Sequence, residues 1–110
     1  MAKSSAFARF KAEVVAVVAA IPEGQVTTYG TIGRYLDATP RQVAYVMATL
    51  TPEESAELPW FRVVAANGVV SSTKLGAVGR RQIARLRAEG VSVTARNKVE
   101  EFESIAWSPG

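Results

Sequence analysis

The residue types that most often carry covalent and acid–base chemistry are missing from this sequence. Its 110 residues include no cysteine and no histidine. Without them the chain cannot form a thiolate nucleophile, a histidine-based proton relay, or a metal site built on thiolates or imidazoles. The sequence therefore favours binding over catalysis, and we predict a protein that is not an enzyme and uses no metal or cofactor.

Positive charge is the chemical feature that the sequence offers instead. The net charge is +3, but residues 60–98 hold eight basic residues against one acidic residue, Glu89. The eight are Arg62, Lys74, Arg80, Arg81, Arg85, Arg87, Arg96 and Lys98. A one-sided basic surface is typical of proteins that bind a phosphate backbone, although a solvated helix face would give the same pattern.

Length and composition describe an ordinary globular chain. Apolar residues make up 48% and charged residues 21% of the sequence, enough for one modest core. We expect one domain over residues 1–110, with the tail at 91–110 packed partly on it. The longest apolar stretch, residues 14–21, is too short to span a membrane, and no secretion signal is visible. We expect a cytoplasmic monomer without membrane contact.

The first half of the chain is predicted to be helical. Apolar residues recur at helical spacing in residues 5–20 and predict a helix that packs on the core. This apolar stripe consists of Phe7, Phe10, Val14 and Val17. A short helix is predicted over residues 29–36, with Thr27 or Thr28 as its N-cap. Another helix is predicted from Pro40 to about residue 50, with Thr39 as its N-cap. This helix and the one over residues 29–36 together form a helix-turn-helix.

The second half of the chain is predicted to contain a loop, two short strands and a basic helix. Residues 51–58 are expected to form an acidic loop, and residues 61–64 a strand. The dipeptide Asn67-Gly68 predicts a tight hairpin turn before a second strand. A basic helix follows over residues 76–89, with Ile83 and Leu86 facing inward and Gly90 at its C-terminal cap. We therefore predict a mainly α domain with a small β-hairpin, of the winged helix-turn-helix type.

Four segments in order carry a resemblance to a known family. They are residues 21–30 (IPEGQVTTYG), 41–43 (RQV), 59–64 (PWFRVV) and 86–90 (LRAEG). The sequence from about residue 21 to 93 resembles the C-terminal DNA-binding domain of O6-alkylguanine-DNA alkyltransferases. Trp60 stands where those enzymes carry the cysteine of their Pro-Cys-His-Arg motif. In this respect the sequence is similar to the alkyltransferase-like proteins, the non-catalytic subgroup that has Pro-Trp-His-Arg at this place.

The resemblance implies a function. Alkyltransferase-like proteins bind O6-alkylguanine in double-stranded DNA by minor-groove binding and nucleotide flipping, without removing the alkyl group. They pass the lesion to nucleotide excision repair proteins, of the UvrA type in bacteria. This sequence departs from the pattern at Phe61, where relatives usually have histidine. It also departs at Thr73 and Lys74, where some have arginine.

The resemblance also assigns residues. It implies that Arg41 fills the gap left by the flipped nucleotide and that Tyr29 lies near the rotating 3′ phosphate. The DNA-binding residues are expected to be Tyr29, Arg41, Gln42, Ala44 and Ala66. The lesion pocket is expected to contain Tyr29, Trp60, Val63, Thr73 and Lys74. Glu89 matches the glutamate of the enzymes' relay, but without histidine a structural salt bridge is its expected role.

Simpler roles exist for the same residues, and another class of protein fits the pattern. Trp60 and Tyr29 are also typical of core aromatics, and Arg41 of a surface residue at a helix end. The alternative function is a winged-helix transcription regulator or architectural DNA binder without lesion preference.

Overall fold

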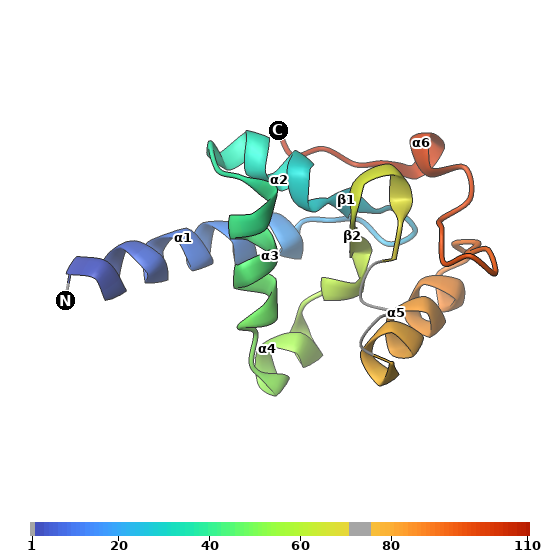
Figure 1. The fold of residues 1–110 in the computed structure, drawn as a ribbon, viewed down its shortest axis with the longest axis horizontal. Helices are drawn as coiled ribbons and strands as arrows, with labels where there is room; N and C mark the ends of the chain where they lie inside the picture. Colours follow the sequence, from blue (N-terminus) through green and yellow to red (C-terminus); the bar gives the residue numbers. More distant parts are fainter. Residues whose placement is uncertain (1, 71–75) are drawn as a thin grey trace.

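Helices α2 (Tyr29–Leu36) and α3 (Pro40–Ala48) form the predicted helix-turn-helix in the computed structural model, which describes residues 2–70 and 76–110 (Figure 1). Thr28 caps α2, its hydroxyl accepting the N–H of Thr31 at 3.0 Å. Thr39 and Gln42 form a reciprocal capping box at the start of α3. The caps set where each helix begins, and Asp37 ends α2 in the left-handed conformation, with a φ of 58°.

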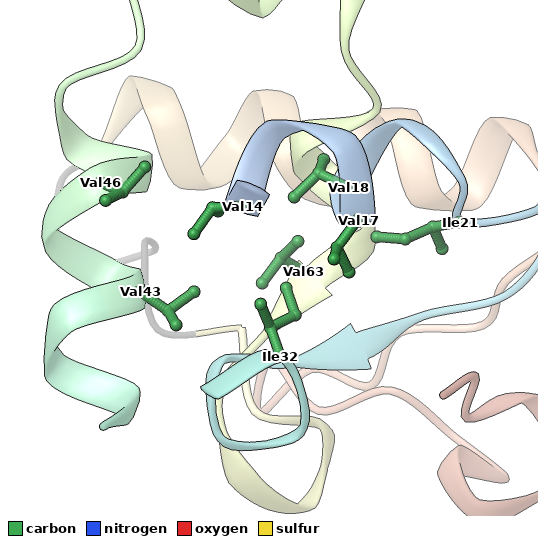
Figure 2. Close-up of a cluster of buried hydrophobic side chains, with 8 residues drawn as sticks. All are labelled: Val14, Val17, Val18, Ile21, Ile32, Val43, Val46 and Val63. Carbon is green, nitrogen blue, oxygen red and sulfur yellow. The ribbon is translucent and has the colours of Figure 1, made fainter. Parts of the chain in front are cut away.

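Helix α1 (Ala2–Ala19) supplies one side of the first core cluster. Figure 2 shows its end, with Val14, Val17 and Val18, facing α2, α3 and β2 (Val63–Val64). The buried members of the cluster are Val14, Val17, Val18, Ile21, Ile32, Val43, Val46 and Val63. The predicted stripe is therefore buried only in its second half, because Phe7 lies beyond the core and is 37% exposed. Among the described helices, none combines the length and apolarity that crossing a membrane requires.

A second core cluster joins helix α5 (Ala77–Ala88) to the tail of the chain. Its buried members are Val26, Phe61, Val64, Val70, Leu86, Val91, Val93 and Val99. Leu86 is buried and Ile83 is partly buried against the cluster, as predicted, and Gly90 leaves the helix with a φ of 86°. At the end of α6 (Phe102–Ile105), Val26 N donates to Ile105 O at 3.0 Å, and Val26 O accepts from Trp107 N at 2.7 Å. The tail thus packs against the strand region of the domain.

The sheet differs from the predicted hairpin. Strand β1 (Thr27–Thr28) pairs in parallel with β2, with Thr27 opposite Val63 and Thr28 opposite Val64. The predicted turn does form: Asn67 and Gly68, in η2 (Ala66–Gly68), have φ values of 64° and 82°. After the turn, however, Val69 makes an antiparallel bridge to Lys98. Ala65 N donates to Val69 O across the turn at 2.8 Å. Beyond this bond, among the described residues, β2 pairs with β1 and Val69 bridges to Lys98, so the predicted hairpin ladder does not form.

The predicted acidic loop contains helix α4 (Pro52–Glu57). Thr51 and Glu54 form a capping box around Pro52, the same arrangement that begins α3. Glu54 also pairs with Lys11 of α1 at 3.0 Å. The N–H of Thr51 and the ammonium of Lys11, both donating to this carboxylate, hold the pKa of Glu54 below its ordinary value of 4.5.

An ion pair between Arg62 and Glu89 joins three segments of the chain. Arg62 lies in η1 (Trp60–Arg62), and its Nε donates to both carboxylate oxygens of Glu89, at 3.0 and 3.1 Å, while its Nη2 also donates to Oε2. Its Nη1 donates to Ile21 O at 2.7 Å, and Gly24 N donates to the same carboxylate at 3.0 Å. The network ties the loop after α1 to η1 and to the end of α5. Glu89 thus has the structural role expected of it.

The pKa of Glu89 reflects a balance between burial and hydrogen bonding. Burial raises the pKa, but the hydrogen bonds from Arg62 and Gly24 and the charges of Arg62 and Arg85 outweigh it. The net pKa is below the ordinary value of 4.5. The folded state therefore favours the charged form of Glu89. The ion pair contributes its full stabilisation above the ordinary pKa, which applies in the unfolded chain, and this contribution is lost as the pH falls through the lower pKa of the folded state.

Replacing Gly33 by alanine should destabilise the helix-turn-helix. A Cβ at this position would lie 2.6 Å from Ala38 O, a backbone atom of the turn between α2 and α3, so the turn must shift. We expect a loss of about 2 kcal/mol in the free energy of unfolding. Gly30, also in α2, is the matched control, since its nearest neighbour would be 3.7 Å away and alanine is the better helix former. Urea unfolding should show Gly33→Ala less stable and Gly30→Ala at least as stable as wild type; equal effects would contradict this account.

Replacing Glu89 by glutamine should lower the free energy of unfolding by about 2–3 kcal/mol at pH 7, because a mostly buried guanidinium loses its counter-charge. The difference from wild type should shrink as the pH falls from 7 to below 4, where the wild-type carboxylate is protonated as well. Urea unfolding across this pH range measures both effects. Glu57→Gln, at an exposed carboxylate, is the control and should change stability by less than about 0.5 kcal/mol. A Glu89→Gln deficit independent of pH would show that the charge is not its cause.

Candidate nucleic-acid interface

A cavity of about 940 Å³ opens between α3, α4, η1 and α5. Its apolar lining comprises Ala44, Met47, Ala48, Leu50, Pro52, Ala56, Trp60, Val63, Val78 and Ala84. Its polar and charged lining comprises Tyr29, Ser55, Arg81, Gln82 and Arg85. Among the described residues the charged groups of the lining are therefore both cationic. A largely apolar hollow with a few polar groups is typical of sites that take an organic ligand.

The cavity brings together three of the predicted pocket residues. Tyr29, Trp60 and Val63 all line it. Ala44, predicted to contact DNA, also lines it, from α3. The other two predicted pocket residues, Thr73 and Lys74, lie outside the described residues.

Trp60 belongs to both the cavity and the core. The indole packs partly against the second core cluster and stands edge-on to Phe61, with ring centroids 6.0 Å apart and an interplanar angle of 88°. It also contributes to the cavity lining. The two roles considered for this tryptophan therefore coexist: it is anchored in the core and forms part of the cavity wall.

Phe61, the departure from the family pattern, positions a charge. Its side chain is buried, with 3% exposure, and the guanidinium of Arg85 lies 4.4 Å from the ring centroid. The guanidinium of Arg62 lies 5.3 Å from the same centroid. Cations at such distances are attracted by the electrons of an aromatic ring. Phe61 thus holds Arg85, which lines the cavity, in a way that depends on an aromatic ring.

Gln82 fixes the cavity wall from within. It is buried in α5, and its Nε2 donates to Phe61 O at 3.1 Å and to Val63 O at 2.9 Å. These bonds attach α5 to the segment that carries Trp60. Gln82 was not predicted from the sequence, since one glutamine in a basic helix carries no signal of its own. Arg81 and Arg85 were not assigned to the pocket either, although their spacing of four places them on one helix face.

The predicted DNA-contacting residues of α3 are accessible. Arg41 and Gln42 are both exposed in its first turn. The Oε1 of Gln42 accepts the N–H of Thr39 at 2.8 Å, so this oxygen serves as part of the helix cap. Ala66 is exposed in η2 and does not line the cavity. The site therefore consists of a cavity bordered by α3 and, beside it, the exposed face of that helix.

Comparisons with known proteins give the same family as the sequence motifs. Residues 9–91 match the family described as 6-O-methylguanine DNA methyltransferase, DNA binding domain. Alkyltransferase-like protein 1 of Schizosaccharomyces pombe is 40% identical over 105 residues, covering 91% of this chain and 95% of that protein. The DNA base-flipping protein of Escherichia coli (strain K12) is 43% identical over 102 residues, covering 90% of this chain and 74% of that protein.

A solved structure shows the same fold. The crystal structure of S. pombe Atl1 in complex with damaged DNA containing O6-carboxymethylguanine superposes with a TM-score of 0.78 and 35% sequence identity. The match covers 92% of this chain and 96% of that one. The predicted winged helix-turn-helix domain and the predicted family are both confirmed, apart from the pairing of the sheet. The chain belongs to the 6-O-methylguanine DNA methyltransferase family, matching its DNA-binding domain and resembling its alkyltransferase-like and base-flipping members.

Proposed function

We propose that this protein recognises O6-alkylguanine in double-stranded DNA without removing the alkyl group. The observation that carries the proposal is the cavity of about 940 Å³, lined by Trp60 and bordered by the helix that exposes Arg41. Helix α3 enters the minor groove, and the modified nucleotide rotates out of the base stack into the cavity. The similarity to one protein named for base flipping and to another bound to damaged DNA supports this assignment.

Each residue of the interface has a role in this proposal. Arg41 occupies the space vacated by the flipped nucleotide, and Tyr29 lies beside its 3′ phosphate. Ala44 lets the helix approach the groove closely, while Gln42 and Ala66 contact the duplex. Val63 lines the pocket with Trp60, and we assign a role in binding the alkylated base to Thr73 and Lys74, which lie outside the described residues. Flipping costs a few kcal/mol, and less for a damaged base, which favours modified nucleotides.

Chemistry of the pocket supports binding over transfer. Alkyl transfer needs an activated nucleophile, and the sequence has no cysteine or histidine to provide one with its proton relay. The indole of Trp60 is a poor nucleophile, but it offers a broad polarisable surface against which a purine or its alkyl group can pack. We therefore assign it to recognition and propose that the protein is not an enzyme.

The proposal also covers the fate of the bound lesion. The resemblance to alkyltransferase-like proteins supports a cytoplasmic protein that marks the lesion for nucleotide excision repair. Its partner in a bacterial cell would be a protein of the UvrA type. Binding as a monomer is consistent with a cavity whose described lining residues all come from the same chain, and with one modified nucleotide per lesion.

Titration of labelled duplexes tests the central claim. Fluorescence anisotropy should show tighter binding to a duplex with one O6-methylguanine than to the same duplex with guanine. Mass spectrometry after incubation should show no methyl group on the protein. Equal affinities would overturn lesion recognition, and a preferred sequence selected from random duplexes would then favour a transcription regulator. A methylated protein would overturn the assignment as a non-enzyme.

Replacing Trp60 by alanine should reduce the lesion preference. Loss of stacking on one base corresponds to about 1–3 kcal/mol, so the ratio of the two affinities should fall about tenfold. The affinity for the undamaged duplex should change little, because an unflipped base does not reach Trp60. Circular dichroism must show the variant folded, since the indole also packs on the core. A loss shared equally by both duplexes would contradict a pocket role.

Replacing Arg41 by alanine should weaken binding to both duplexes, because the exposed arginine at the start of α3 contacts DNA whether or not a base is flipped. We expect a loss of about tenfold for each, measured by the same anisotropy titration at fixed salt. Arg96→Ala, which also removes one exposed positive charge but in the tail, is the matched control. Equal losses for the two variants would show that Arg41 contributes only net charge.

A further inference from the structure

Two exposed aromatic side chains meet outside both core clusters. Phe7 of α1 and Tyr45 of α3 stand edge to face, with ring centroids 5.9 Å apart and an interplanar angle of 75°. They are 37% and 64% exposed. Tyrosine combines an apolar ring with a polar tip and is enriched at interfaces for that reason. Neither side chain has a role in the cavity.

The position of Tyr45 on α3 connects the pair to the DNA-binding face. Successive residues of an α-helix are separated by about 100°. Val43 and Val46 are buried and set the inward side of α3. Arg41 and Tyr45, four residues apart, lie one turn apart on the outward side. Tyr45 therefore shares the exposed ridge of the helix with the arginine assigned to the duplex.

The cavity and the aromatic pair lie on opposite sides of the exposed face of α3. Ala44 and Ala48 line the cavity, which continues to α5, whereas Tyr45 leans toward Phe7 on α1. Figure 1 shows the first half of α1 on the left of α3 and α5 on its right. A nucleotide that enters the cavity thus leaves the duplex on one side of α3, and the other side of the same helix is formed by Tyr45 and Phe7.

We propose that Tyr45, held in place by Phe7, contacts the sugar–phosphate backbone of the strand that does not carry the lesion. This inference rests on the proposed function. The two strands of a groove flank any helix lying in it, so the strand opposite the flipped nucleotide lies on the α1 side. A deoxyribose presents apolar C–H groups to the ring of Tyr45, and the phenol of Tyr45 can donate to a phosphate oxygen.

Phe7 acts as a positioning residue for Tyr45. An edge-to-face contact restricts the tyrosine ring before DNA arrives, which reduces the conformational entropy lost on binding. The contact also holds the ring to one side, so that Ala44 and Ala48 can approach the groove. Removing Phe7 should therefore act largely through Tyr45.

Affinity measurements on both duplexes test the contact. Tyr45→Ala should weaken binding about fivefold for the modified and the undamaged duplex alike, leaving the lesion preference unchanged, and Tyr45→Phe should retain most of the affinity. Phe7→Ala should weaken binding less, and the double variant should bind no worse than Tyr45→Ala. Tyr35→Ala, at a tyrosine of α2 that is 55% exposed, is the control and should bind as wild type. Thermal unfolding must show each variant folded at the assay temperature.

Crosslinking tests the strand assignment. With Tyr45 replaced by p-benzoyl-L-phenylalanine, irradiation should attach the protein to the strand without O6-methylguanine when each strand is labelled in turn. Crosslinks mainly to the modified strand, or wild-type affinity in Tyr45→Ala, would overturn this inference. The proposed function would stand in that case if the wild-type protein still preferred the modified duplex. Equal wild-type affinities for the two duplexes would instead overturn the proposed function.

Discussion

The ion pair between Arg62 and Glu89 is the interaction on which the geometry of the site depends. It joins the end of α5 to η1, and through Ile21 O and Gly24 N to the loop that follows α1. Each of these segments borders or supports the cavity, yet they are far apart in sequence. In the alkyltransferases the matching glutamate is expected to serve a proton relay. Here the carboxylate of Glu89 accepts hydrogen bonds from a guanidinium and a backbone N–H, so the residue has a structural role.

The cavity depends on a second set of contacts that keep α5 in place. Gln82 holds this helix to the backbone of Phe61 and Val63, and Arg85 lies over the Phe61 ring. Arg85 thus remains on the cavity wall while the aromatic ring beneath it stays in the core. Histidine at position 61 would offer a smaller and more polar ring to that guanidinium. The substitution is therefore best understood together with Arg85, as a structural pair, rather than as the loss of one relay residue.

Local sequence signals explain why some elements were predicted and others were not. The helix-turn-helix was predictable because Thr39, Pro40 and Gln42 satisfy the first turn of α3 with their own chemistry. The start of α4 carries the same signal in Thr51, Pro52 and Glu54, but its acidic residues suggested a loop. The parallel pairing of Thr27 with Val63 had no local signal, since the partners are joined only by the tertiary fold. For the same reason the cavity role of Arg81 and the wall contacts of Gln82 required the structure.

A binder without a reaction step must obtain all its selectivity from the difference between two bound states. An alkyltransferase can tolerate weak discrimination in binding, because only the modified base reacts with its thiolate. A protein that acts as proposed here has no such second filter, and flipping an undamaged guanine costs more than flipping a damaged one by only a modest amount. Under the proposed function, the remaining discrimination has to come from the groups that line the cavity, which include Trp60 and apolar residues of α3 and α4. Contacts on the rest of α3, including Arg41, are available to either duplex and set the affinity on which that discrimination acts.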